Sequence, residues 1–297
     1  MSKKLTRRNF LKGTAAAAVA SQLKKPFHSH NPRYTLAASK LNVAAIGAGG
    51  KGYSDINHCS DENIVALADV DSKRAAQAFA EFDKASKYAD FRDMLDKHPE
   101  IDAVTISTPD HFHAYAADYA MRLGKHVYVQ KPLAHTVFEA RQMRVLSKKH
   151  GVVTQMGNQG HNGSGYLTLV QLIRSGVIGK IKEAHAWSNR PIWPQGVERP
   201  KGSDPVPKHL HWDLWLGVAK QRPFVGPQPG SKRNRGVYHP FNWRGWMDFG
   251  VGALGDMGCH IIDPIVWSCG LGSPTAVRST GPEPNGETFP KIGRAHV

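Results

Sequence analysis

The stretch LNVAAIGAGGKG, residues 41–52, sets a short apolar run directly before a group of glycines. An apolar run of this length that ends in glycine is typical of a buried parallel strand. Gly47, Gly49 and Gly52 then have the spacing G-x-G-x-x-G. The first allows a tight turn, the second lets a pyrophosphate approach the backbone, and the third lets the next helix pack on the strand. Residues 51–59 can form that helix, so the stretch predicts a strand, a phosphate-binding turn and a helix.

An acidic residue follows at the distance that a dinucleotide site requires. The next apolar run, residues 63–68, ends in Asp69, twenty-two positions after Gly47 (69 − 47). An acid at this place accepts hydrogen bonds from the adenosine ribose hydroxyls. We therefore predict a site for NAD or NADP. Asp69 favours NAD, but Arg74 is close enough in sequence to contact a 2′-phosphate, and a glycine turn without a ligand is the alternative.

Strands and helices continue to alternate through the first half of the chain. The patterns indicate helices at residues 91–98, 111–124 and 136–151, and strands at residues 101–107, 125–130 and 152–156. Such alternation predicts a doubly wound, parallel α/β sheet. Ligand contacts gather at the carboxyl ends of its strands, which points to the loops at residues 107–113 and 130–135.

The second half is less regular. We expect a helix that closes at Gly176, a strand over residues 180–187, and then long loops rich in proline, glycine and tryptophan. Aromatic residues at this density need burial or a ligand. Two interpretations are open for the histidines and tryptophans of this half: they line a sugar pocket, or they take part in ordinary loop packing. These residues are His161, His209, His211, Trp212, Trp215, Trp243 and Trp246.

The stretch GDMGCHIID, residues 255–263, carries three titratable side chains. In a helix, Asp256, His260 and Asp263 would lie on one face, because residues i, i+4 and i+7 are neighbours there. An imidazole can be the base for an alcohol that loses hydride, and a nearby cation can stabilise the developing alkoxide. The alternatives are a metal site completed by His209 or His211, or a polar face without chemistry.

Several motifs in order resemble the Gfo/Idh/MocA oxidoreductase family over about residues 41–267. These motifs are GAGGKG (47–52), DVD (69–71), TPDHFH (108–113), GKHVYVQKP (124–132) and the later D-x-x-x-H at residues 256–260. The resemblance implies an NAD(P)-binding Rossmann domain, residues 39–157. It also implies an α+β substrate and oligomerisation domain with an open, mostly antiparallel sheet, residues 158–290. The family usually has glutamate where this chain has Gln130, which removes a charge beside the adjacent lysine.

The resemblance also implies roles for individual residues. The catalytic set is Lys131, Asp256 and His260, with Asp263 as a structural or supporting carboxylate. The family needs no metal. The implied cofactor contacts are Gly47, Gly49, Gly50, Gly52, Asp69, Thr108, Pro109, His113 and Lys131.

The implied reaction is reversible oxidation of a sugar or cyclitol hydroxyl, in a homo-oligomer. His260 would remove the hydroxyl proton while Lys131 steadies the oxygen. Two alternatives remain: an NAD-dependent glycosidase that oxidises its sugar transiently, and a non-catalytic protein that only binds the dinucleotide.

The N-terminal segment, residues 1–38, explains most of the net charge of +15. It carries eight lysines and arginines and no acid, so the remainder has 31 basic and 24 acidic residues, a net charge of +7 (31 − 24). We therefore expect no nucleic-acid partner. TRRNFLKGTAAAAVA, residues 6–20, resembles a twin-arginine export signal. It predicts contact with the twin-arginine translocase, a periplasmic location, and a cofactor held tightly through export of the folded protein.

The rest of the chain limits the other classes. No other stretch approaches the ~20 apolar residues that a membrane span needs. Three scattered cysteines do not describe a disulfide framework. Residues 291–297 follow without any capping pattern, and we interpret them as a non-native tail after a C-terminally truncated second domain.

Overall fold

A computed structural model describes residues 40–190, 192–231 and 235–290. The export segment and the interpreted tail lie outside these ranges. Six parallel strands form one sheet in the order β3-β2-β1-β4-β5-β6, which is the doubly wound order of a Rossmann fold. The predicted parallel sheet is confirmed. Its strands are β1 Asn42–Ile46, β2 Asn63–Ala68, β3 Ser86–Tyr88, β4 Ala103–Ile106, β5 His126–Gln130 and β6 Thr154–Gly157.

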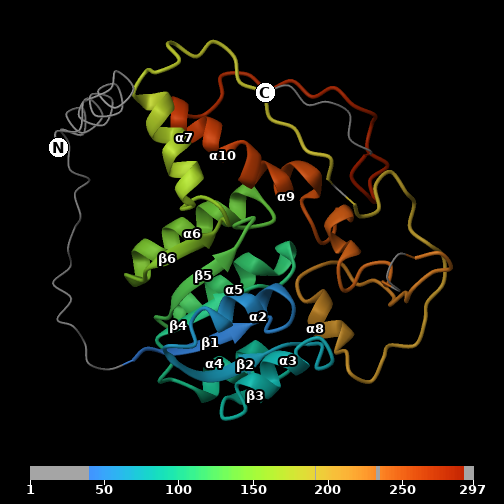
Figure 1. Cartoon of the computed structure of the whole chain (residues 1–297). Helices are drawn as coiled ribbons and strands as arrows, with labels where there is room; N and C mark the ends of the chain where they lie inside the picture. Colours follow the sequence, from blue (N-terminus) through green and yellow to red (C-terminus); the bar gives the residue numbers. More distant parts are fainter. Residues whose placement is uncertain (1–39, 191, 232–234, 291–297) are drawn as a thin grey trace, which may run out of the picture.

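Helices cover both faces of this sheet (Figure 1). Side chains of β1 alternate between the two faces, as the two-residue period of a strand requires. Val43 and Ala45 belong to the core beside α2 and α3, whereas Ala44 and Ile46 belong to the core beside α4, α5 and α6. These helices are α2 Lys51–Asn57, α3 Ala76–Glu81, α4 Phe91–Lys97, α5 Asp110–Arg122 and α6 Val137–His150.

Local sequence signals set the ends of α6. Thr136 accepts the backbone N–H of Glu139, and the Glu139 carboxylate accepts the backbone N–H of Thr136. This reciprocal pair is a capping box. Gly151 ends the helix in the left-handed conformation with φ 65°, as glycine does at many helix ends. The predicted boundaries, residues 136–151, are therefore correct to within one residue.

The turn after β1 is too tight for a side chain at Gly47 or Gly52. Gly47 has φ 81°, and a Cβ atom on Gly52 would lie 1.6 Å from the carbonyl oxygen of Gly47. The helix α2 can therefore begin directly over the end of β1 only because these positions are glycine. This arrangement places the amino end of α2 at the carboxyl edge of the sheet.

The second half consists of short helices joined by long connections, which run around one side of the molecule in Figure 1. Nine buried residues, mostly aromatic, form its core against Val70 of the Rossmann part. They are Leu210, Trp212, Trp215, Leu216, Val225, Tyr238, Trp243, Trp246 and Phe249. The helices are α7 Ser164–Arg174, α8 Trp212–Leu216, the 3-10 turn η2 Asn242–Gly245, α9 Gly252–Ile261 and α10 Asp263–Cys269.

The expected strand at residues 180–187 is not formed in the described structure. A strand is stable only when its backbone groups pair with a neighbour, and no ladder in the described ranges includes these residues. Trp187 is accordingly 83% exposed. In the described second half, antiparallel pairing is limited to isolated bridges, of which Trp246 with Thr288 is one.

The stretch GDMGCHIID is not one continuous helix. The helix α9 ends at Ile261, and Asp263 begins α10 with a proline in its first turn. Pro264 cannot donate to the carbonyl of His260, four residues earlier, so it interrupts the helix here. The Tyr166 hydroxyl lies 3.4 Å from that carbonyl. The expected single helix through Asp256, His260 and Asp263 is therefore wrong, and Asp263 does not line the cavity that Asp256 and His260 line.

None of the helices in the described ranges is long and apolar enough to cross a membrane.

Candidate active site

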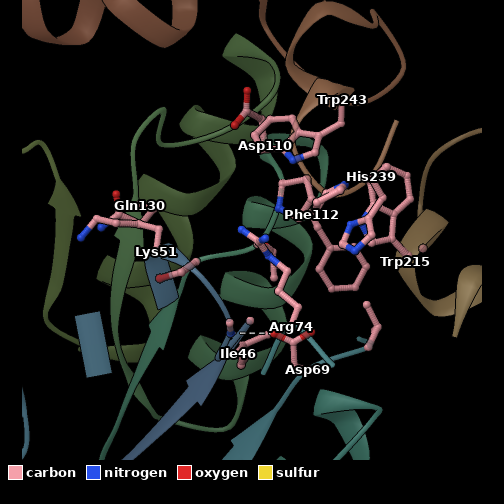
Figure 2. A pocket seen from close by; sticks show the side chains of 18 of the residues that line it. Ile46, Lys51, Asp69, Arg74, Asp110, Phe112, Gln130, Trp215, His239 and Trp243 are labelled. Atoms are coloured by element: carbon pink, nitrogen blue, oxygen red, sulfur yellow. Dashed lines mark hydrogen bonds between the residues drawn. The ribbon is translucent and has the colours of Figure 1, made fainter. Parts of the chain in front are cut away.

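A cavity of about 570 Å³ lies at the carboxyl edge of the sheet, between the Rossmann part and the second half of the chain. The glycine turn, the loops after β2, β4 and β5, and the region of α8 and α9 all contribute to its wall. Figure 2 shows Gln130 on one side and Trp215 and Trp243 on the other, with Arg74 reaching between them. The fold therefore brings both halves to one site, where doubly wound sheets bind ligands.

The glycine turn and Asp69 form the part of the cavity that suits a dinucleotide. Asp69 accepts the backbone N–H of Gly49 at 2.8 Å and that of Asp71 at 2.9 Å. Burial raises the pKa of Asp69, and the two N–H bonds oppose that rise. A cofactor fits this wall on two observations. Gly47 and Gly49 line the cavity with backbone that carries no side chain, and the buried Thr108 hydroxyl has no hydrogen-bond partner within the described residues.

Arg74 lies across the turn. A Cβ atom on Gly50 would be 2.2 Å from a terminal guanidinium nitrogen of Arg74, and one on Gly49 would be 2.7 Å from its Cγ. The side chain therefore packs against the turn and leaves room only for glycine beneath it. This places the Arg74 guanidinium where the phosphates of a dinucleotide would approach. Arg74 could therefore contact those phosphates as well as the 2′-phosphate that its place in the sequence suggests.

Lys131 and Asp256 form an ion pair between the two halves. The Lys131 ammonium donates to the Asp256 carboxylate at 2.8 Å and to its backbone carbonyl at 2.9 Å. Asp256 also accepts from Arg244 Nε at 3.3 Å and is 4% exposed. A lysine has three N–H donors. Two are used here, so the third is available to an oxygen in the cavity.

His260 lines the same cavity, one helical turn after Asp256. Its Nδ1 lies 3.1 Å from the backbone carbonyl of Gln159. A carbonyl only accepts, so Nδ1 carries the proton and Nε2 keeps its lone pair in the neutral ring. Burial, and then the charge of Lys131, lower the pKa of His260 below its ordinary value of 6.5. The imidazole is thus neutral at pH 7 and able to accept a proton.

The structure places the remaining expected cofactor contacts in different ways. Thr108 and Pro109 line the cavity. His113 does not, because it is 1% exposed and lies behind the wall, between the carbonyls of Pro132 at 2.7 Å and Thr108 at 2.8 Å. His113 therefore braces the two loops that carry Thr108 and Lys131, and the expectation that it contacts the cofactor is not met by the geometry.

Asp263 belongs to a separate cluster. It accepts from Tyr166 at 2.8 Å and lies 2.6 Å from His161 Nδ1. The His161 ring in turn stacks on Trp267, with the ring centroids 4.3 Å apart. These contacts hold α10 against α7, and they turn Asp263 away from the suggested metal ligands. Within the described residues, no group of three or more histidine, cysteine or acidic side chains could hold a metal ion.

The aromatic residues of the long loops divide between the cavity and the core. Trp215 and Trp243 line the cavity, whereas Trp246 is 1% exposed and belongs to the core. Stacking pairs Trp212 with Trp215 at 4.6 Å between ring centroids. His209 and His211 contribute nothing to this cavity.

Two charged residues of the site were missed by sequence reasoning. Arg244 reaches Asp256 from the 3-10 turn η2, and Asp110 at the start of α5 accepts the backbone N–H of Val251 at 3.2 Å. Burial raises the pKa of Asp110 to about 7. The position of Asp110 inside TPDHFH was a signal for it. Arg244 had none, because only the fold brings η2 against α9.

Comparisons with known proteins agree with this architecture. Residues 41–158 match the model of the Gfo/Idh/MocA oxidoreductase family with an NAD-binding Rossmann fold, and residues 169–285 match its C-terminal alpha/beta domain. The chain belongs to the Gfo/Idh/MocA family. Residues 4–23 match the twin-arginine translocation signal, so the chain carries an export signal at its N-terminus.

Individual members of the Gfo/Idh/MocA family cover the chain only in part. An inositol 2-dehydrogenase of Serratia proteamaculans is 30% identical over 156 residues, 51% of this chain and 46% of that protein. A glycosyl hydrolase family 109 protein of Shewanella sp. (strain W3-18-1) is 29% identical over 158 residues, 49% of this chain and 34% of that protein. The chain thus matches less than half the length of these relatives.

Among solved structures, GenD2 from gentamicin A biosynthesis, in complex with NAD, has a TM-score of 0.53. It is 18% identical and covers 78% of this chain and 54% of its own. At this identity the likeness shows a shared fold.

Proposed function

We propose that the protein oxidises a secondary hydroxyl of a sugar or cyclitol with NAD as the hydride acceptor. One observation carries the proposal: Lys131 and His260 come from the two halves of the chain and line the same cavity as the glycine turn. The cation and the neutral base needed for an alcohol oxidation are thereby gathered beside a dinucleotide site. The similarity to an inositol 2-dehydrogenase supports the substrate class.

The side chains divide the work. His260 Nε2 accepts the hydroxyl proton, because Nδ1 is committed to the Gln159 carbonyl. The free N–H of Lys131 stabilises the oxygen as negative charge develops on it. Asp256 holds that ammonium with two contacts and keeps its charge balanced in a buried site. Bound NAD supplies the redox chemistry, and the protein supplies position and charge.

The net reaction tests this proposal. We expect the purified protein to form NADH in a one-to-one ratio with the oxidised sugar or cyclitol, measured by NADH absorbance and by product analysis in the same sample. The second candidate, suggested by the glycosyl hydrolase family 109 relative, is a glycosidase that returns the hydride to its substrate. Release of a sugar from a glycoside without net NADH would establish that function instead.

We propose NAD over NADP because Asp69 occupies the ribose-binding position. A carboxylate there repels a 2′-phosphate, so Asp69→Ser should raise the ratio of kcat/KM for NADP to kcat/KM for NAD by about tenfold, equivalent to about 1.4 kcal/mol. The serine hydroxyl can still accept one of the two backbone N–H bonds. The matched measurement is the same ratio for Asp61→Ser, an exposed acid near the end of α2. An unchanged ratio in Asp69→Ser would remove Asp69 from the ribose site.

The export signal extends the proposal to location. We propose that the protein works in the periplasm and is exported with NAD already bound, since the twin-arginine pathway carries folded proteins. We also propose the division into an NAD(P)-binding domain, residues 39–157, and a substrate domain, residues 158–290, with the homo-oligomer formed through the second domain.

A further inference from the structure

A row of polar side chains runs along the wall of the cavity, from α2 to the loop after β6. The Lys51 ammonium pairs with the Asp55 carboxylate. Asp55 also accepts from the Ser107 hydroxyl at 2.7 Å and from the Gln130 amide at 2.8 Å. Gln130 accepts from the Gln159 amide at 2.9 Å. Three segments of the chain, α2, β5 and the loop after β6, thus contribute to one row, which we call the amide row: Lys51, Asp55, Gln130 and Gln159.

The chemistry of position 130 decides whether this row can exist. Gln130 donates to Asp55 with its nitrogen and accepts from Gln159 with its oxygen. Asp55 is 7% exposed and Gln130 is 5% exposed, so water cannot replace either bond. A glutamate could still accept from Gln159, but it would set a second carboxylate against Asp55. Two carboxylates at such a distance cannot both ionise without a large cost.

The row continues to the proposed base. The Gln159 amide nitrogen donates a second hydrogen bond, to the Gly157 carbonyl at 2.8 Å. Two hydrogen bonds therefore fix this side chain and so restrict the backbone of Gln159. The backbone carbonyl of the same residue faces Nδ1 of His260 at 3.1 Å. This carbonyl selects the tautomer with Nδ1 protonated. The groups with the strongest electrostatic influence on His260 are Lys131, Asp256 and Arg190.

We propose that Asp55, Gln130 and Gln159 are positioning residues for His260, and that Asp55 carries the buried negative charge of this layer, so that position 130 requires an amide. The inference rests on the proposed function of His260 as the base. It accounts for the amide at position 130, which donates to Asp55 and accepts from Gln159. Asp55 on α2 supplies this negative charge. Gln130 connects it to the loop after β6, where the Gln159 carbonyl orients the His260 imidazole.

The first experiment exchanges the charge between the two positions. We expect Gln130→Glu to lower kcat/KM at least tenfold and to weaken NAD binding. The double variant Asp55→Asn with Gln130→Glu should recover to within about threefold of wild type, because the asparagine amide then donates to the glutamate. Gln142→Glu, an exposed position on α6, is the matched control and should leave both quantities unchanged. A harmless Gln130→Glu, or a double variant worse than the single one, would overturn the inference.

The second experiment tests the path from the row to His260 without disturbing the buried carboxylate. In the NAD-bound protein, ¹⁵N NMR should show the His260 ring as the Nδ1–H tautomer, with its signal assigned by comparison with His260→Ala. Gln159→Ala should convert this ring to a mixture of tautomers and lower kcat at least fivefold, with KM for the alcohol changed less. An unchanged tautomer in folded Gln159→Ala would refute the positioning role.

These readouts separate the inference from the proposed function. If the protein oxidises no alcohol, the proposed function fails, but NAD affinity and the ring tautomer still show whether Asp55, Gln130 and Gln159 are coupled to His260. If Gln130→Glu does not fold, recovery of folding in the double variant supports the coupling, and failure of both variants leaves the decision to Gln159→Ala.

Discussion

Alanine in place of His260 is expected to lower kcat/KM for alcohol oxidation by about 10²-fold or more, while NAD affinity stays within about threefold of wild type. The loss follows because general base catalysis by a positioned side chain contributes about 10²–10⁴-fold. The Nε2 lone pair of His260 is the base at the site, since Nδ1 faces the Gln159 carbonyl. Steady-state kinetics and NAD titration by fluorescence measure the two quantities separately.

The same variant distinguishes an enzyme from a non-catalytic dinucleotide-binding protein. A protein that only binds NAD would keep its function after this change, because the glycine turn and Asp69 lie on other elements. His185→Ala is the matched control, since that side chain is 67% exposed and outside the cavity lining. Equal activities for His260→Ala and wild type would show that another group accepts the proton.

The Rossmann part could be predicted from the sequence because its signals are local. Apolar runs, turn glycines and caps each act within a few residues, as the capping box at Thr136 and Glu139 shows. The short α3 and β3 were not predicted. The three residues of β3, 86–88, are too few to show a two-residue period, and they form a strand only because they pair with β2.

The second half could not be predicted at the same level, because its structure depends on contacts between distant residues. Trp215 packs against Phe249, thirty-four positions later in the chain (249 − 215), and no sequence periodicity predicts such a contact. The exception is the break between α9 and α10. Pro264 is a local signal for this break, because proline cannot donate to a carbonyl four residues earlier. The spacing of Asp256, His260 and Asp263, in contrast, indicates a continuous helix.

The candidate site shows the same division. The glycine turn, Asp69 and Lys131 follow their strands directly, so the order of motifs locates them at one edge of the sheet. Residues that act through another residue cannot be recognised from the sequence. Asp55 lies inside α2 and reads as an ordinary helical acid, yet folding sets its carboxylate 2.8 Å from Gln130, seventy-five positions away. Only the fold reveals that these two positions are coupled.

Methionine in place of Lys131 is expected to lower kcat/KM by about 10²–10³-fold, because it removes the cation from the oxygen that becomes negative in the transition state. Methionine retains the length and the apolar contacts of the lysine stem. Asp256 keeps the Arg244 contact at 3.3 Å, so the buried carboxylate is not left without a cation and the fold should persist. Thermal unfolding of the NAD-bound variant checks the fold, and steady-state kinetics measure the loss.

The pH profile of this variant separates the charge of Lys131 from its shape. His260 works as the neutral base, so kcat/KM rises as pH rises through its pKa. Burial and the Lys131 charge lower that pKa, which puts the rising limb of the wild type below pH 6.5. Lys131→Met removes one of the three causes that lower the pKa of His260, the others being burial and Arg190, and leaves Asp256, which raises it. The limb must therefore move to higher pH, whereas Lys131→Arg, which keeps the charge, should leave it near the wild-type position. A limb that stays in place in Lys131→Met would mean that the ammonium and the imidazole do not share a site in solution.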